Sequence, residues 1–198
     1  MKTIILASAS PRRKELLKQI GLKFKVVPSE YEESLDSGLD PHELAQRLSL
    51  EKANSVARIQ PDALVIAADT LGVLNGKVLG KPHTESEARK MLAMLSGKAH
   101  SVITGFTIMD AATNKSLTRT VETRVYLRKL TSGEIDAYVK SGEPLDKVGG
   151  YAIQGLGAVI VERIEGDYFN VVGLPLRALA ESLKEFGVKV LQAGHSSF

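Results

Sequence analysis

The stretch Ala63-Leu64-Val65-Ile66-Ala67-Ala68-Asp69-Thr70 joins an uninterrupted apolar run to an aspartate. A run of apolar residues without polar alternation predicts a strand that is buried on both faces of a sheet. We expect this strand to end at Asp69-Thr70. Open α/β sheets usually place their ligand crevices at the carboxyl ends of strands. Asp69 is therefore a candidate catalytic residue, and an aspartate that only caps a turn is the alternative.

Helix and strand signals alternate on both sides of this strand. Residues 3–6 predict a short strand, and Ser10-Pro11 then starts a helix that runs to Gly21. Asp40-Pro41 starts a second helix, and Asn75-Gly76 predicts a hairpin turn. The other expected elements are helices from residues 84, 131 and 176, and strands at residues 102–109, 121–127 and 158–164. This alternation predicts an α/β protein.

The size and composition of the chain indicate one ordered domain. It has 198 residues, of which 43% are hydrophobic and 25% are charged. This length allows one well-buried core or two small lobes that share a cleft. The composition is typical of globular rather than disordered proteins. We expect a single domain over residues 1–191 and a flexible tail over residues 192–198.

Several classes of partner and chemistry are disfavoured. The net charge of +3 suits an anionic ligand, but it is too small for a nucleic-acid-binding stripe. The absence of cysteine excludes disulfides and thiol catalysis. The apolar run at residues 4–7 is too short for a signal peptide or a membrane span, so we expect a cytoplasmic protein without a membrane partner. The histidines have no ligand spacing and are assigned no role: His42, His83, His100 and His195.

The segment Ser8-Ala9-Ser10-Pro11-Arg12-Arg13 predicts a phosphate site. Two arginines occupy the first turn of the expected helix, where the helix dipole is already positive. This placement is unfavourable unless the helix amides, the serine hydroxyls and a guanidinium together hold phosphates. An exposed arginine pair that only solubilises the helix end is the alternative.

Other polar residues interrupt apolar or glycine-rich surroundings. Lys52 lies on the apolar stripe of the second helix, where its ammonium either reaches the surface or points into an anion-binding cleft. Lys81, in Gly80-Lys81-Pro82, suits a phosphate contact or a surface turn. Gln154 lies among glycines that would let its amide approach a planar base, and a tight structural loop is the alternative. Glu32 and Glu33 lie in an acidic loop over residues 30–33, which would bring a second carboxylate to a metal or is merely solvated.

These segments together resemble the Maf family, the septum-formation-inhibitor-like nucleotide pyrophosphatases. The likeness runs from about residue 5 to about residue 190 and rests on seven motifs in order: Ala7-Ser8-Ala9-Ser10-Pro11-Arg12-Arg13, Ser49-Leu50-Glu51-Lys52-Ala53, Ala68-Asp69-Thr70, Gly80-Lys81-Pro82, Thr104-Gly105, Lys147-Val148-Gly149-Gly150-Tyr151-Ala152-Ile153-Gln154-Gly155 and Asn170-Val171-Val172-Gly173-Leu174-Pro175. The resemblance implies an elongated mixed sheet flanked by helices, with two lobes around a central cleft, as in inosine-triphosphatase-like proteins. It also implies a homodimer.

The activity implied by the resemblance is hydrolysis of a nucleoside triphosphate to the monophosphate and pyrophosphate. Asp69 would be the proton acceptor that activates water. Glu33 would place a divalent cation, Mg²⁺ or Mn²⁺, together with Asp69. The acidic register is ambiguous by one residue, so Glu32 is the alternative for Glu33. The residues that would neutralise the triphosphate are Ser8, Arg12, Arg13, Lys52 and Lys81.

The branch of the family that acts on dTTP and UTP is similar to this chain at Asp69-Thr70 and Ile153-Gln154-Gly155. We therefore expect Arg12, Thr70 and Gln154 to determine specificity. A glutamine amide donates and accepts at once, as the edge of uracil or thymine requires. The expected purpose is to remove non-standard pyrimidine nucleotides before their incorporation. A non-enzymatic nucleotide-binding regulator of cell division is the alternative, although a carboxylate without a partner would repel the phosphates of its ligand.

Overall fold

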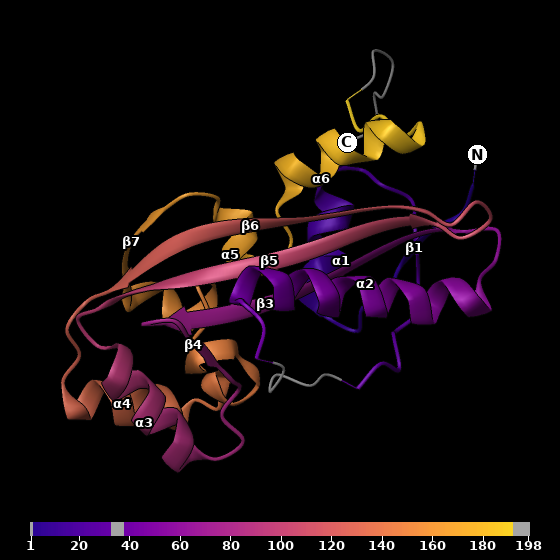
Figure 1. The fold of residues 1–198 in the computed structure, drawn as a ribbon. Coiled ribbons are helices and arrows are strands. Elements are labelled where there is room, and N and C mark those ends of the chain that lie inside the picture. The colour runs from indigo at the N-terminus through magenta and orange to yellow at the C-terminus, as the bar shows by residue number, and fades with distance from the viewer. Residues whose placement is uncertain (1, 33–37, 192–198) are drawn as a thin grey trace.

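The protein is built on a single mixed sheet (Figure 1). The computed structural model describes residues 2–32 and 38–191. The strand order is β2-β1-β3-β5-β6-β7, and β4 pairs with β3 beside this path. The bounds are β1 Ile4–Leu6, β2 Lys25–Val26, β3 Leu64–Leu74, β4 Lys77–Leu79, β5 Ala99–Asp110, β6 Lys115–Leu127 and β7 Val161–Glu165. Among the described strands, the pairs β1–β2 and β1–β3 are parallel and the other pairs are antiparallel. The long β3, β5 and β6 give the molecule its elongated shape.

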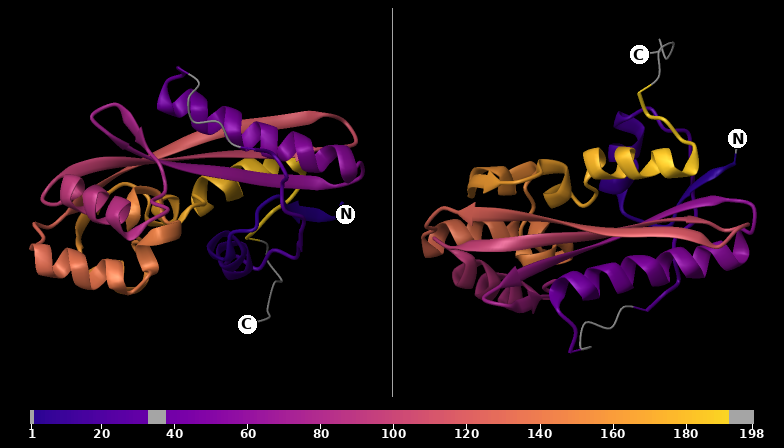
Figure 2. Two further views of the ribbon diagram at one scale, coloured as in Figure 1. Left: turned by 90° about the horizontal axis from the view of Figure 1, so that it is seen from below. Right: turned by 45° about the horizontal axis from the view of Figure 1, so that its top comes forward.

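Helices cover both faces of this sheet (Figure 2). Helix α2, Pro41–Ile59, lies along one face, and α1, Pro11–Gln19, lies with α6, Leu176–Leu183, on the other. Helix α5, Tyr168–Val172, contacts β5 and β6. Helices α3, Glu85–Leu95, and α4, Ser132–Lys140, pack together near β4 and β7 (Figure 1). Short 3-10 turns occupy residues 143–146, 148–150, 155–159 and 184–186.

The apolar run of β3 is buried on both faces, as its composition predicts. Leu64 and Ile66 pack into the core beneath α1 and α6, whereas Val65 and Ala67 pack against α2. The expected caps are also present: the side chains of Ser10, Asp40 and Thr131 accept hydrogen bonds from the first turns of their helices. The mixed sheet flanked by helices is confirmed.

The predicted end of the central strand at Asp69-Thr70 is wrong. Strand β3 continues to Leu74, because β5 pairs with it from Leu64 to Val73. Beyond Thr70 the strand again carries buried apolar side chains, Leu71, Val73 and Leu74. The hairpin turn follows as expected, with Asn75 and Gly76 at positive φ angles of 50° and 76°. Asp69 therefore lies inside a long strand, opposite Gly105 of β5.

Gly105 lets the backbone of α2 rest directly on β5. A Cβ at this position would lie 2.2 Å from the carbonyl oxygen of Ala45 and 2.4 Å from its carbon. Helix α2 carries Lys52 toward the strand that holds Asp69, so this close approach fixes the distance between two candidate site residues.

We predict that Gly105→Ala destabilises the protein by about 1–3 kcal/mol, since α2 has to move away from the sheet. Chemical denaturation measures the change. Gly133→Ala is the matched control, because nothing lies within 4 Å of a Cβ there. A Gly105→Ala protein as stable as the wild type would contradict the close packing of α2.

Candidate active site

A cleft opens where the central strand β3 changes neighbours. The amide of Ala7 still bonds the carbonyl of Ile66 at 2.8 Å, after which the chain turns into α1. Strand β4 joins the same edge of β3 only at Gly72. In the described part of the chain, the edge of β3 between these points has no strand neighbour, and Asp69 and Thr70 lie in that gap. The cleft has a volume of about 880 Å³. This volume is within the usual range for small-molecule sites.

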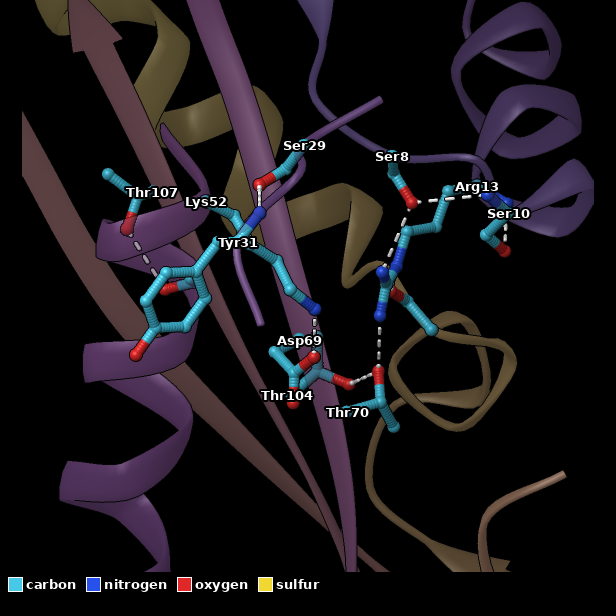
Figure 3. A network of polar contacts seen from close by, with 12 residues as sticks. Ser8, Ser10, Arg13, Ser29, Tyr31, Lys52, Asp69, Thr70, Thr104 and Thr107 are labelled. Carbon is cyan, nitrogen blue, oxygen red and sulfur yellow. Dashed lines mark hydrogen bonds and ion pairs between the residues drawn. The ribbon is translucent and has the colours of Figure 1, made fainter. Parts of the chain in front are cut away.

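Asp69 and Lys52 form a buried ion pair on the cleft wall (Figure 3). Asp69 is 5% exposed and Lys52 is 8% exposed. The Lys52 side chain therefore points inward from α2, and the alternative that its ammonium reaches the surface is wrong. The assumption that the Asp69 carboxylate has no partner is also wrong, because Lys52 balances its charge. Burial of both charges carries a desolvation penalty, which their attraction offsets only when the geometry is good and further hydrogen bonds are made.

Arg13 joins three segments beside this ion pair (Figure 3). Its Nε donates to the carbonyl of Gly173 at 2.8 Å, and its Nη2 donates to the Thr70 hydroxyl at 3.0 Å. Its Nη1 lies 3.3 Å from the Ser8 hydroxyl. The Thr70 hydroxyl in turn lies 3.0 Å from that of Thr104. Arg13 thus ties the start of α1 to β3 and to the turn after α5, and its role in phosphate binding stays a prediction.

The cleft brings together most of the predicted site residues. Its lining includes Ser8, Arg12, Arg13, Lys52, Asp69, Thr70 and Lys81. These residues come from the β1–α1 turn, from the first turn of α1, from α2, from β3 and from the loop after β4. Segments far apart in the sequence therefore meet at one site, as the phosphate and catalytic predictions require.

Two other predicted site residues lie outside the lining, and a third is not among the residues that the structure describes. Gln154 is exposed and does not line the cleft, although its neighbours Ala152 and Ile153 do. Glu32 is exposed and also lies outside the lining. Glu33 falls outside the residues that the structure describes.

The cleft carries an excess of positive charge. Its cationic residues are Arg12, Arg13, Lys52, Lys81 and Lys147. Among the described residues, its carboxylates are Asp69 and Asp146. Asp146 pairs with Lys147, and the hydrogen bond from that ammonium holds the pKa of Asp146 below its usual range. A cleft with this balance suits a polyanionic ligand such as a phosphate chain.

Residues 3–186 match the model of a known family, described as Maf-like protein. The chain belongs to the Maf family. A protein of Methanosarcina barkeri named dTTP/UTP pyrophosphatase is 52% identical over 197 residues, which are 99% of this chain and 100% of that protein. A protein of the same name from Pelotomaculum thermopropionicum is 50% identical over 191 residues, which are 96% of this chain and 100% of that protein.

A solved structure shares the Maf chain's fold at low sequence identity. The HAM1 protein from Coxiella burnetii is 18% identical and superposes with a TM-score of 0.56, covering 93% of this chain and 100% of that one. This likeness supports the elongated α/β architecture. None of the Maf helices in residues 2–32 and 38–191 is long and apolar enough to cross a membrane.

The donor set of the Maf cleft fits a metal only in part. Within the described ranges, no three histidine, aspartate or glutamate residues form a group that could hold an ion. Mg²⁺ commonly keeps several waters and binds through one or two carboxylates and the phosphates of a substrate. Asp69 can supply one such carboxylate. The described residues therefore fit an ion that arrives with a phosphate chain rather than a dedicated protein cage.

The structure adds a buried pair to the Maf cleft that sequence reasoning missed. His100 Nε2 lies 2.7 Å from the Tyr151 hydroxyl, and both residues are buried on the cleft wall. Burial lowers the pKa of His100 to about 4, so its ring is neutral at pH 7. A histidine within an apolar strand is weak sequence evidence for a site, because its contact with Tyr151 is visible only in the folded structure.

Proposed function

We propose that the protein is a nucleoside triphosphate pyrophosphatase that hydrolyses dTTP and UTP to the monophosphate and pyrophosphate. One observation carries this proposal: Asp69 lies on the wall of a cationic cleft, at the gap between β1 and β4, and its charge is balanced by Lys52. The names of relatives at 47% to 52% identity over nearly the whole chain support the pyrimidine substrates. The regulator alternative has no comparable support.

The residues of the cleft have two roles: one acts as a general base, and others bind the phosphate chain. Asp69 accepts the proton of the attacking water, which makes the water a stronger nucleophile. Arg12, Lys81 and the Ser8 hydroxyl hold the phosphate chain and stabilise the charge that develops as pyrophosphate leaves. Arg13 and Lys52 keep Thr70 and Asp69 in place. Catalysis of this kind rests on position and charge rather than on a covalent intermediate.

We further propose that the enzyme uses Mg²⁺ or Mn²⁺, which Asp69 would help to hold. When bound, such an ion would supply Lewis-acid polarisation of the phosphate oxygens and offset their charge. The second carboxylate is proposed to be Glu33, which lies outside the described residues, with Glu32 as the alternative. Removal of free divalent ions with a chelator is expected to stop pyrophosphate release, and added Mg²⁺ restores it.

We propose that Arg12, Thr70 and Gln154 determine specificity for the base or for the rest of the substrate. The Thr70 hydroxyl is held by Arg13 and Thr104, so it is presented in a fixed orientation. Gln154 lies next to the cleft-lining Ile153, where its amide can meet the edge of a bound uracil or thymine. We propose that the biological purpose is the removal of non-standard pyrimidine nucleotides. Free nucleotides of this kind occur in the cytoplasm, which is the proposed location, and the homodimer stays a prediction.

The proposed substrates can be tested with a panel of triphosphates. We expect rapid pyrophosphate release from dTTP and UTP, and slow release from CTP, GTP and 7-methyl-GTP, in the presence of Mg²⁺ or Mn²⁺. Pyrophosphate and orthophosphate are measured in parallel. Turnover of 7-methyl-GTP alone would overturn the substrate assignment. Tight nucleotide binding without any turnover would instead favour the regulator of cell division.

A further inference from the structure

Two side chains hold one wall of the cleft: Tyr138 in the last turn of α4, and Glu143 in the 3-10 turn that follows it. The carboxylate of Glu143 accepts hydrogen bonds from the Tyr138 hydroxyl at 2.7 Å, from the Gly157 amide at 2.9 Å and from the Leu156 amide at 3.0 Å. The Tyr138 hydroxyl also accepts a bond from the amide of Ala152 at 3.1 Å. The two side chains therefore fix residues 152–157 at both ends, and Gln154 lies between these ends.

Glycines make this close contact possible. Gly155 has a φ angle of 72°, and a Cβ there would lie 2.4 Å from Glu143 Oε2. A Cβ at Gly157 would lie 2.0 Å from the Ala152 carbonyl oxygen and 2.7 Å from the Tyr138 hydroxyl oxygen. The chain thus folds back tightly around Glu143, in a conformation that larger residues would not permit.

The electrostatics fit a fixed, ionised carboxylate. Desolvation acts to raise the pKa of Glu143, but the bonds from Tyr138, Gly157 and Leu156 outweigh it and hold the pKa below its usual value. Burial and the bond to Glu143 raise the pKa of Tyr138, so its hydroxyl stays protonated and can donate. Both carboxylate oxygens accept hydrogen bonds: Oε1 accepts from Tyr138 and Gly157, and Oε2 accepts from Leu156.

We propose that Glu143 and Tyr138 are positioning residues that set the base selectivity of the cleft. They hold Ala152 and Ile153 against the cleft and fix the backbone on either side of Gln154. Hydrogen-bond recognition weakens steeply when distance or angle departs from the optimum, so an amide selects a base edge only from a fixed backbone. This inference rests on the proposed function, since Gln154 is assigned to the base there.

The test compares Glu143→Gln with the wild-type protein. Glutamine has an NH₂ group, which donates, in place of one of the two acceptor oxygens of Glu143. A backbone N–H of residues 152–157 therefore loses its acceptor. We expect the ratio of kcat/KM for dTTP to kcat/KM for dCTP to fall by about tenfold, mostly through a higher KM for dTTP. Tyr138→Phe, which removes the acceptor for Ala152, is expected to change the ratio in the same direction.

Glu134→Gln is the matched control. Glu134 lies in α4, as Tyr138 does, and makes the capping box with Thr131 and an ion pair with Arg128. Its loss is expected to lower stability without changing the ratio between dTTP and dCTP. Thermal unfolding of all the variants separates a general loss of stability from a loss of selectivity.

Hydrogen exchange gives a readout that is independent of activity. We expect the amides of Ala152, Leu156 and Gly157 to be protected in the wild type, and those of Leu156 and Gly157 to exchange faster in Glu143→Gln. Faster exchange together with a lower selectivity ratio supports the proposal. A wild-type protein that selects dTTP, with an unchanged ratio in Glu143→Gln, overturns it while leaving the proposed function intact. A wild-type protein that releases no pyrophosphate overturns the proposed function itself.

Discussion

Replacement of Asp69 by asparagine is expected to reduce pyrophosphate release about 10³-fold, which is within the range for loss of a general base. Asparagine has nearly the same shape, and its amide oxygen can still accept a bond from Lys52. It does not take up the proton of the attacking water at neutral pH. The expected loss is therefore in kcat, with a smaller change in KM. Steady-state kinetics with dTTP and Mg²⁺ measures both constants.

Asp62→Asn is the matched control for this variant. Asp62 is exposed in the turn before β3, outside the cleft. Its replacement by asparagine removes one negative charge, as Asp69→Asn does. Its activity is expected to equal that of the wild type. Circular dichroism establishes that Asp69→Asn is folded under the assay conditions. Activity of Asp69→Asn within twofold of the wild type would show that another group activates the water.

Replacement of Lys52 by methionine is expected to give the largest loss of stability. Both members of the Lys52–Asp69 pair are buried, with side chains 10% and 7% exposed. Removal of one partner from such a pair costs about 3–5 kcal/mol, because the other charge stays in a poorly solvated place. Methionine keeps the apolar stem of the lysine, so little packing is lost. Urea denaturation measures the change in the free energy of unfolding.

A double variant separates this charge effect from a packing effect. Lys52→Met combined with Asp69→Asn removes both charges, and we expect it to recover at least half of the lost stability while remaining inactive. Lys90→Met, at an exposed position of α3, is expected to change stability by less than about 0.5 kcal/mol. No recovery in the double variant would mean that the cost arises from packing around Lys52 instead.

The sequence predicts those features of the fold that depend on local chemistry. The caps at Ser10, Asp40 and Thr131, and the turn at Asn75-Gly76, are set by the residues that form them, and all are present. The end of β3 depends instead on its partner β5, whose pairing extends to Val73. The extent of that pairing cannot be seen in the sequence of β3, so the strand was expected to end too early.

The same distinction applies to the candidate site. Asp69 stands out because it interrupts a long apolar run, and Lys52 stands out because it breaks an apolar helical stripe. Their ion pair, however, depends on the approach of α2 to Gly105 of a different strand. Glu143 carries no local signal, since its partners lie on α4 and 13 to 14 residues further along the chain. Contacts of this kind require the folded structure.

The most direct test of the proposed activity is phosphorus NMR of the initial products formed from dTTP and Mg²⁺ by the wild-type protein and by Asp69→Asn. The account predicts equal amounts of dTMP and pyrophosphate from the wild type, and almost no product from the variant in the same time. Formation of dTDP and orthophosphate would contradict cleavage between the α and β phosphates. Equal rates for the two proteins would contradict the role of Asp69.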